Sequence, residues 1–263
     1  MSGPHVVVHR DPALLAAAAA ARLTVRLVDV QHARRVASLV LTGGGTGIAL
    51  LEQLLRSPAR DAVDWSRVEI FWGDERFLEP GHPDRNETRA RAALLDHVPV
   101  DPARVHPMPA AVSDRTGDPR NDPDRAARDY AAELAALTSP EDHGPVPKFD
   151  VCLLGVGEEG HVASVFPSSP AVYETERSVV AVHNCPKPPP VRISLTLPAI
   201  RRASEVWLVT TGATKAAAVA MAIGGAGEVQ LPAAGAVGRA RTQWLLDRAA
   251  AGKLPRDLVP PLI

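Results

Sequence analysis

The sequence predicts an α/β protein with one domain, a mostly parallel sheet and helices on both faces of that sheet. Short apolar runs alternate with helical patterns along most of the chain, and glycine-rich loops follow several of these runs. Strand, glycine loop and helix in repeated order indicate a parallel sheet that is covered on both faces. A chain of 263 residues can bury a large core, and no internal repeat divides it. Residues 1–263 are therefore expected to form a single domain.

The N-terminal part is expected to contain three strands, each followed by a helix. Asp11 before Pro12 is typical of a helix N-cap with proline at the first helical position. The alanine-rich run that follows is too short to span a bilayer, and it lacks the basic flank of a signal peptide. Strands are expected at residues 6–8, 38–42 and 68–72, and helices from Asp11 into the thirties, at 48–55 and at 85–95.

The remaining part is expected to add five strands and two helices. Residues 107–123 are rich in Pro, Asp, Arg and Gly without periodicity, which predicts an exposed loop. The prolines at 186–190 exclude a helix or a central strand there. Strands are expected at residues 150–154, 178–182, 192–195, 206–210 and 242–246, and helices at 124–137 and 215–223.

The overall charge and the cysteine content exclude several classes of protein. The chain has 29 Lys+Arg against 30 Asp+Glu, so nothing in the charge balance indicates a nucleic-acid or membrane partner. Any anion site must therefore be built locally. Cys152 and Cys185 are the only two cysteines, and Cys152 lies in an apolar run that predicts a buried thiol. No disulfide framework is indicated, and a cytoplasmic location is expected.

Two polar motifs follow expected strands. In TGGGTG at residues 42–47, glycines before a helix allow a close approach of the backbone to an anion, while the free amides point at it. Gly43, Gly44, Gly45 and Thr46 are thus candidate phosphate ligands, although a tight turn without a ligand is the alternative. No G-K-[ST] follows, so this is not a Walker loop.

The second motif is GDER at residues 73–76, where Asp74 and Arg76 follow the third strand. Arginine offers a planar fork for phosphate or carboxylate, and a surface salt-bridge cluster is the alternative. Because ligands bind at the carboxyl ends of the strands in parallel sheets, we expect both motifs to be loops that line one crevice. The loop that follows residues 150–154 should meet them there.

That loop spells G-x-G-x-x-G in LLGVGEEGH at residues 153–161, the pattern of a dinucleotide-binding turn. A dinucleotide site needs an acidic residue at the end of the next strand. Here prolines follow instead, and Glu174 and Glu176 precede the next strand rather than end it. The motif is therefore interpreted as a loop that places His161.

His161 is the candidate general base, since histidine can accept a proton near neutral pH. It is expected to open a helical turn, with Glu158 and Glu159 able to orient the imidazole; a purely structural histidine is the alternative. The histidine spacing does not indicate a zinc site. A cysteine hydrolase using Cys185 with His183 is not indicated either, because CPKPPP lacks the helix N-terminus that activates such thiols.

Taken together, several motifs resemble the 6-phosphogluconolactonase family. The matching segments appear in family order over nearly the whole chain: LTGGGTG at 41–47, IFWGDERFLEPGHPDRNETRARAALLDHVPV at 70–100, FDVCLLGVGEEGHVASVFP at 149–167, CPKPPPVRISLTLPAI at 185–200 and LPAAGAV at 231–237. The combination is far more specific than any one glycine motif. The resemblance implies a Rossmann-like sheet fold shared with glucosamine-6-phosphate deaminases and ribose-5-phosphate isomerases.

It also implies hydrolysis of 6-phosphogluconolactone in the pentose phosphate pathway, without cofactor or required metal. The family histidine that activates water corresponds to His161, and Glu159 stands where the family usually has Asp. Three further departures are Gly45 for Ser, Gly47 for Pro and Arg85 for Ser. Gly45 removes one hydroxyl from the expected phosphate loop. Positive charge for the phosphate is expected from Arg76, Arg192 and Lys215, with Lys187 as a further candidate.

Two other functions compete with the lactonase. In the deaminases the stretch after Gly-His continues as Phe-Asn-Glu-Pro, whereas residues 164–167 here are SVFP, so the expected carboxylate is absent. A non-catalytic sugar-phosphate sensor usually has an attached DNA-binding module, for which this chain has neither room nor a basic region. The expected partner is a small sugar-phosphate lactone. The sequence leaves the oligomeric state open between a monomer and a small homo-oligomer.

Overall fold

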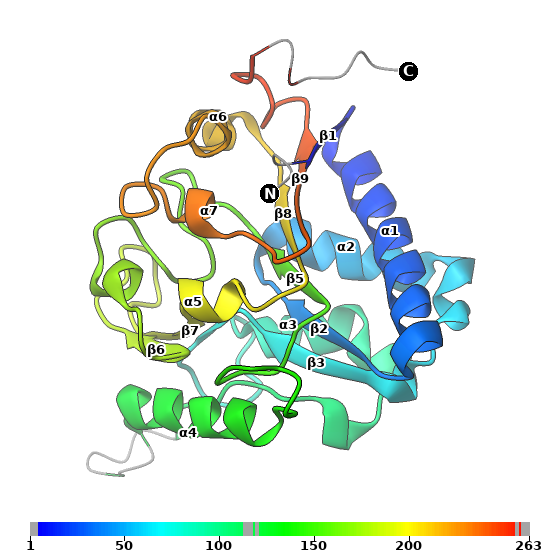
Figure 1. Ribbon diagram of the computed structural model, residues 1–263, viewed down its shortest axis with the longest axis vertical. Helices are drawn as coiled ribbons and strands as arrows, with labels where there is room; N and C mark the ends of the chain where they lie inside the picture. The colour runs from blue at the N-terminus through cyan, green and yellow to red at the C-terminus, as the bar shows by residue number, and fades with distance from the viewer. Residues whose placement is uncertain (1–4, 113–117, 119–120, 256–257, 259–263) are drawn as a thin grey trace.

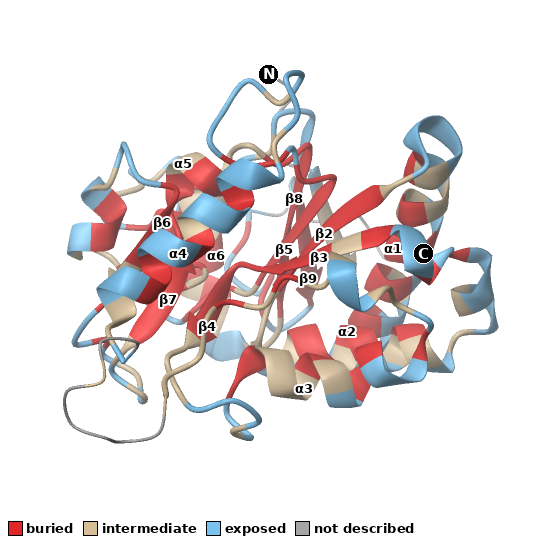
Figure 2. Cartoon of the chain, turned by 90° about the horizontal axis from the view of Figure 1, so that it is seen from below, coloured by how far each residue is buried: buried red, intermediate tan, exposed pale blue. Residues whose placement is uncertain are grey.

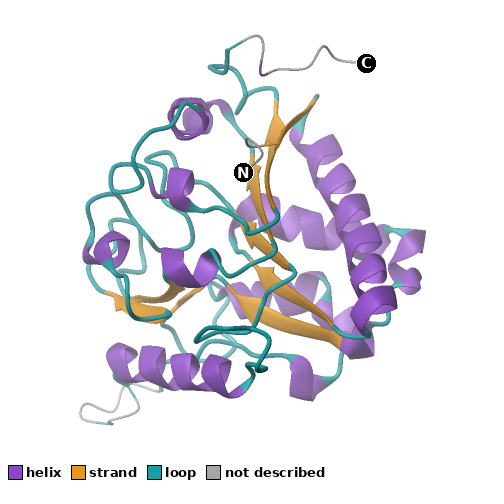
Figure 3. Ribbon diagram, in the orientation of Figure 1, coloured by secondary structure: helices purple, strands orange, loops and turns teal. Residues whose placement is uncertain are grey.

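A six-stranded parallel sheet forms the centre of the computed structural model, which describes residues 5–112, 118, 121–255 and 258 (Figures 1 and 3). The strand order is β1-β9-β8-β5-β2-β3, and every neighbouring pair is parallel. The strands are β1 His5–His9, β2 Ala37–Leu41, β3 Val68–Trp72, β5 Val151–Leu154, β8 Glu205–Thr210 and β9 Arg241–Asp247. This confirms the expected parallel α/β architecture.

Helices cover both faces of this sheet (Figure 1). On one face lie α1 Pro12–Arg34, α2 Gly44–Arg56 and α3 Asn86–Ala93; on the other lie α4 Pro123–Ala136, α5 Leu197–Ile200, α6 Ala216–Ile223 and α7 Pro232–Gly235. Short 3₁₀ helices lie at Pro58–Ala62, Trp65–Arg67, Leu95–His97, Pro102–Arg104, Pro170–Tyr173 and Ala213–Lys215. Among the described residues, none of the helices combines the length and apolarity that crossing a membrane requires.

Two hydrophobic cores follow from the alternation of side chains along each strand. In β2, Leu39 and Leu41 point into the core beneath α1 and α2, whereas Val40 points into the core on the opposite face. All three side chains are at most 1% exposed, and Figure 2 shows the strands β2, β5 and β8 in the centre of the sheet in the buried colour. Strands buried on both faces are typical of parallel sheets, which explains their continuous apolar sequence.

A second sheet differs from the sequence prediction. Its three antiparallel strands are β4 Asp74–Arg76, β7 Arg192–Leu195 and β6 Val179–Val182. Residues 73–76 were expected to be a loop, and that expectation is wrong for β4. Gly73 joins the two sheets because its N–H donates to the Leu41 carbonyl at 2.9 Å and its carbonyl accepts from Leu195 at 2.9 Å. The long-range pairing with β7 therefore continues the extended backbone beyond β3.

Most helix bounds agree with the predictions. The side chain of Asp11 caps α1 by accepting a hydrogen bond from the backbone N–H of Leu14 at 2.9 Å, as expected. Helix α2 begins at Gly44 rather than at Ile48, so the glycine run is the first turn of the helix and not a separate loop.

The predicted loop at residues 107–123 is only partly described, because residues 113–117 and 119–120 lie outside the described residues. Residues 107–112 are not exposed, and Met108 is 1% exposed. The prediction of an exposed loop is therefore wrong for residues 107–112. This segment packs against the buried side chain of Arg85, whose Nη2 donates to the Met108 carbonyl at 2.8 Å.

The sheet order places a crevice between β2 and β5. From β2 the chain continues to β3 on one side, whereas from β5 it continues to β8 and β9 on the other. Ligands of open α/β sheets bind outside the carboxyl ends of the strands at such a change of direction. The loops that follow β2, β3, β5 and β8 all leave the sheet at this edge.

Candidate active site

A cavity of about 370 Å³ lies at this edge. It is lined by the loops after four parallel strands and by the segment that precedes β7. The structure brings ten of the eleven predicted site residues to its wall: Gly43, Gly44, Gly45, Thr46, Asp74, Arg76, His161, Lys187, Arg192 and Lys215. The eleventh, Glu159, lies beside the imidazole of His161.

His161 lies in the wall of the cavity, and its side chain is mostly buried, with 15% exposed. One face of the imidazole stacks on Phe166, with ring centroids 4.4 Å apart and an interplanar angle of 29°. Its Nδ1 lies 3.2 Å from Oε1 of Glu159, close enough for an ion pair although not aligned as a hydrogen bond. Burial lowers the pKa of His161 below its usual value, with Glu159 opposing this effect and Lys187 adding to it.

The loop before His161 is a turn that requires its glycines. The N–H of Gly157 donates to the His161 carbonyl at 3.0 Å, and a Cβ on Gly157 would overlap the imidazole. Gly160 has φ +86°, a conformation that favours glycine. No helix follows in the described residues 161–169, so the expected helical turn at His161 is wrong. Ala163, with φ 49°, turns the chain out of the helical path.

Glu159 faces the imidazole and also binds the ammonium group of Lys187. Its Oε2 lies 3.0 Å from Nζ of Lys187. Burial acts to raise the pKa of Glu159, but a backbone hydrogen bond and Lys187 outweigh it and leave the pKa below its usual range. Glu159 is therefore an anion that His161 and Lys187 share.

Arg192 is only 5% exposed and holds the segment that contains Lys187. Its Nη2 donates to the carbonyls of Lys187 at 3.0 Å and Pro188 at 3.3 Å, and its Nε donates to Pro189 at 3.3 Å. Its Nη1 lies 3.7 Å from Oδ2 of Asp74. The expected phosphate contact of Arg192 stays a prediction, and most donors that it would use are engaged within the protein.

The first turn of α2 lines one end of the cavity and offers there the backbone amides that a helix leaves unpaired. The N-cap Gly43 provides no side-chain hydrogen bond to this turn, and no acidic residue lies in it. Free amides and the helix dipole favour a bound anion there. The hydroxyl of Thr46 lies 2.8 Å from that of Thr211, so the loop after β8 supplies a hydroxyl at this end. The same loop places Lys215 on the cavity wall.

Asp74 is buried and held by its neighbours. Ser164 donates its hydroxyl to Oδ2 of Asp74 at 2.6 Å. The side-chain amide of Asn86 donates to the Asp74 carbonyl at 2.8 Å and to Oδ1 at 3.2 Å. These contacts join β4, α3 and the loop of His161, and they hold the Asp74 carboxylate at the cavity wall.

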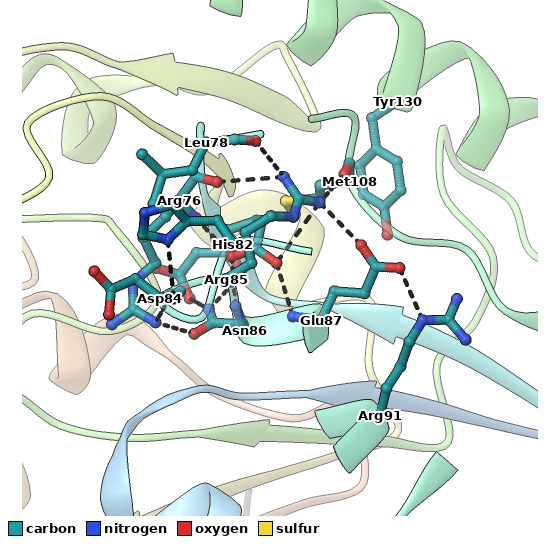
Figure 4. Close-up of polar contacts among 12 residues, drawn as sticks. Arg76, Leu78, His82, Asp84, Arg85, Asn86, Glu87, Arg91, Met108 and Tyr130 are labelled. Carbon is teal, nitrogen blue, oxygen red and sulfur yellow. Dashed lines mark hydrogen bonds and ion pairs between the residues drawn. The ribbon is translucent and has the colours of Figure 1, made fainter. Parts of the chain in front are cut away.

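Arg76 reaches the cavity from β4, beside a buried network of charges (Figure 4). Its Nη1 donates to the Asp84 carbonyl at 3.0 Å and to Oδ1 of Asn86. Among the described residues, its Nε has no hydrogen-bond partner although it is buried. The guanidinium is thus fixed in place through Nη1, while its buried Nε is unpaired within the described part of the chain.

Beneath Arg76, Arg85 is 1% exposed and donates to the Leu78 carbonyl at 3.2 Å and to Oε2 of Glu87 at 3.1 Å (Figure 4). The buried carboxylate of Glu75 accepts from the backbone N–H groups of Asn86 at 2.7 Å and Glu87 at 2.8 Å, which caps α3. Burial raises the pKa of Glu75, and Arg85 opposes this rise. This network fixes the segment after Arg76.

Polar residues at the cavity or supporting it that the sequence did not indicate include Asn86, Ser164, Thr210 and Thr211. Thr210 is 1% exposed, lines the cavity and has a hydroxyl without a hydrogen-bond partner among the described residues. Thr210 and Thr211 end β8 or follow it, so the same strand-end rule that selected Thr46 could have selected them. Asn86 and Ser164 act through contacts distant in sequence, for which the pattern offers no indication.

The sequence profile of the glucosamine-6-phosphate isomerase/6-phosphogluconolactonase family matches residues 10–244. The chain belongs to this family. Within it, the chain is 62% identical to a 6-phosphogluconolactonase of Streptomyces coelicolor, over 98% of this chain and 97% of the relative. It is 54% identical to a 6-phosphogluconolactonase of Mycobacterium tuberculosis, over 93% of this chain and 96% of the relative.

Solved structures of the family have the same fold. The 6-phosphogluconolactonase of Trypanosoma brucei superposes with a TM-score of 0.83 at 29% identity, covering 97% of this chain and all of the other. A monomeric glucosamine-6-phosphate deaminase superposes with a TM-score of 0.74 at 22% identity, covering 94% of this chain and 99% of the other. The second likeness concerns the fold alone.

Proposed function

We propose that this chain hydrolyses 6-phospho-D-glucono-1,5-lactone to 6-phospho-D-gluconate, a step of the pentose phosphate pathway. The observation that supports this most is the sharing of one cavity by two features: a histidine beside a carboxylate, and a helix end suited to an anion. A sugar-phosphate lactone has an ester carbonyl that suits the histidine and a phosphate that suits the helix end. The relatives at 62% and 54% identity that are named 6-phosphogluconolactonase support the same activity.

In this proposal the 6-phosphate lies on the first turn of α2. The amides of Gly44, Gly45 and Thr46 face it, and Lys215 and Arg76 provide positive charge from the cavity wall. The position of the phosphate then orients the lactone ring toward His161. Holding the reacting carbonyl in one geometry lowers the barrier without any covalent chemistry from the protein.

His161 acts as the general base. It removes a proton from a water molecule as the water oxygen attacks C1 of the lactone. The bond between C1 and the ring oxygen then breaks, and the imidazolium returns the proton to that oxygen. The carboxylic acid that forms loses its proton to solvent. Glu159, 3.2 Å from Nδ1, stabilises the imidazolium, and Nε2 is the nitrogen left to contact the water.

The proposal is tested by incubating the purified chain with 6-phosphoglucono-1,5-lactone. Proton release is followed as acidification of the solution and product formation by ³¹P NMR, and the rate of spontaneous hydrolysis is subtracted from both. We expect catalysed opening of the lactone. A parallel incubation with glucosamine 6-phosphate should release no ammonia. Ammonia release, or tight binding of 6-phosphogluconate without turnover of the lactone, would instead support the deaminase or the sensor.

We also propose that residues 1–263 form a single domain and that the protein acts in the cytoplasm. The family match over residues 10–244 supports the first point. The two cysteines, both buried and free, support a reducing compartment.

A further inference from the structure

Three charged side chains form a continuous chain at the edge of the cavity: Lys187, Glu159 and His161. Oε2 of Glu159 lies 3.0 Å from Nζ of Lys187, and Oε1 lies 3.2 Å from Nδ1 of His161. Each carboxylate oxygen thus faces a different cation or potential cation. Lys187 is bound by the Glu159 oxygen that does not face the imidazole, so its ammonium is paired within the protein.

The position of Lys187 is built into the fold. Arg192 of β7 donates hydrogen bonds to three successive carbonyls, those of Lys187, Pro188 and Pro189. Prolines precede and follow the lysine and limit its backbone on both sides, and the N–H of Cys185 donates to the Pro190 carbonyl at 2.8 Å, which closes the loop around it. A buried arginine committed in this way holds the lysine's backbone over the glutamate.

The charges that act on the imidazole come from three elements. Glu159 precedes it on the same loop, Lys187 comes from the segment before β7, and Asp74 comes from β4. Asp74 is itself bound by Ser164 and lies 3.7 Å from Arg192. Burial lowers the pKa of His161, Glu159 and Asp74 raise it, and the Lys187 ammonium lowers it. Lys187 is the cation in this set that opposes protonation of His161.

We propose that Lys187 is a positioning residue that acts on His161 through Glu159, and that it sets the lower end of the pH range in which His161 takes a proton from water. This rests on the proposed lactonase function. By pairing with one oxygen of Glu159, Lys187 limits the attraction of that carboxylate for a protonated imidazole. His161 therefore stays neutral, as a base must, while Glu159 still orients the ring.

The test is the pH dependence of kcat/KM for the Lys187→Met variant. Methionine keeps much of the stem and removes the charge. We expect the acidic limb of the profile to move to higher pH, with kcat/KM lowered several-fold near about pH 6 and within about twofold of the unchanged protein near about pH 9. Lys187→Arg should restore the original profile.

Unphosphorylated glucono-1,5-lactone makes the experiment decisive, because it has no phosphate that could titrate or contact a lysine. An effect through the base displaces the profiles of both lactones equally. If Lys187→Met instead raises KM only for the phosphorylated lactone and leaves both pH profiles in place, Lys187 is a phosphate ligand and the proposal fails.

Two further variants complete the design. In a Glu159→Gln background, replacing Lys187 should displace the profile less than it does in the unchanged protein, since the carboxylate that links the two is gone; an equal displacement would contradict action through Glu159. Lys148→Met removes a lysine outside the cavity and should leave the profile unchanged. Absence of lactone hydrolysis by the unchanged protein would refute the proposed function, which separates that failure from failure of the Lys187 role.

Discussion

The imidazole of His161 packs directly against the Cα of Gly157. A Cβ on Gly157 would overlap Nδ1 and Cε1 of the imidazole and come within 2.8 Å of Oε2 of Glu159. The N–H of the same glycine donates to the His161 carbonyl at 3.0 Å. The glycine pattern that resembles a dinucleotide turn therefore provides space for a histidine and its carboxylate.

Gly157→Ala should lower kcat strongly while the protein stays folded. The added methyl group displaces the imidazole and separates it from Glu159, and a misplacement of about 1 Å in a reacting group can cost about 10²-fold in rate. Steady-state kinetics with circular dichroism would measure both effects. Gly227→Ala is the matched control, because that glycine is exposed and its nearest neighbour is the Gln230 side chain at 3.4 Å. Equal activity of both variants would contradict this role of Gly157.

His161→Gln should reduce kcat by about 10²–10⁴-fold, the usual contribution of a general base. Because burial lowers the pKa of His161, the neutral base should persist into mildly acidic solution. The kcat/KM of the unchanged protein should then fall only as the pH drops through this lowered pKa. His183→Gln, at a histidine that pairs with Asp124 outside the cavity, should keep full activity. A His161→Gln variant with unchanged kcat would remove His161 from the mechanism.

Arg76→Ala should mainly raise KM for the phosphorylated lactone, since the guanidinium lines the cavity with an unpaired Nε. The rise in KM should be much smaller for glucono-1,5-lactone, which lacks the phosphate. Lys215→Met should behave in the same way, because both cations are assigned to the phosphate. Kinetics with the two substrates measure the difference. Equal losses on both lactones would contradict a phosphate role for either side chain.

His106 should make the stability of the protein depend on pH above neutrality. It lies between two carboxylates, with Nε2 2.8 Å from Glu69 and Nδ1 2.9 Å from Glu133. Burial acts to lower its pKa, but the hydrogen bonds to Glu133 and Glu69 outweigh it and raise the pKa of His106 from 6.5 to about 9. Because the folded value is the higher one, this stabilisation is complete below pH 6.5 and is lost as the pH rises through about 9.

Thermal unfolding between about pH 7 and about pH 10 measures this effect. The unchanged protein should lose more Tm over that range than His106→Gln, which cannot acquire the charge. Parallel curves for the two proteins would show that the His106 charge does not stabilise the fold.

The sequence could predict the cavity because its walls are strand ends. Apolar runs locate β2, β3 and β5, and the edge where parallel strands end brings together the segments that contain Thr46, Asp74 and His161. It could not predict contacts between distant segments. Thr46 and Thr211 are 165 residues apart and Asp74 and Ser164 are 90 apart, and such pairings depend on the register of the folded sheets.

The same limit explains the error at residues 73–76. A polar sequence after an apolar strand predicts a loop, but pairing with β7 makes β4 from it. The sequence does not predict the burial of Glu75 and Arg85 either, since charged residues are mostly exposed. Their position became clear only from the hydrogen bonds that each makes to backbone groups of a different segment.

Replacing Arg85 should destabilise the protein strongly. Arg85→Leu removes donors from the carbonyls of Leu78 and Met108 and leaves the buried Glu75, whose Oε2 lies 3.8 Å from Nη2, without its cation. Breaking a buried ion pair on one side costs about 3–5 kcal/mol, which corresponds to roughly 6–20 °C in Tm for a chain of this size.

Thermal unfolding of three variants would distinguish an uncompensated charge from lost packing. The double variant Arg85→Leu with Glu75→Gln should be less destabilised than the sum of the two single changes, because no unpaired buried charge remains. Arg89→Leu, in the helix that Arg85 precedes as N-cap and without an ion pair among the described residues, should change the stability by less than about 0.5 kcal/mol. Additive effects of the two single changes would show that Glu75 does not depend on Arg85, and that the rigidity of the segment after Arg76 has another source.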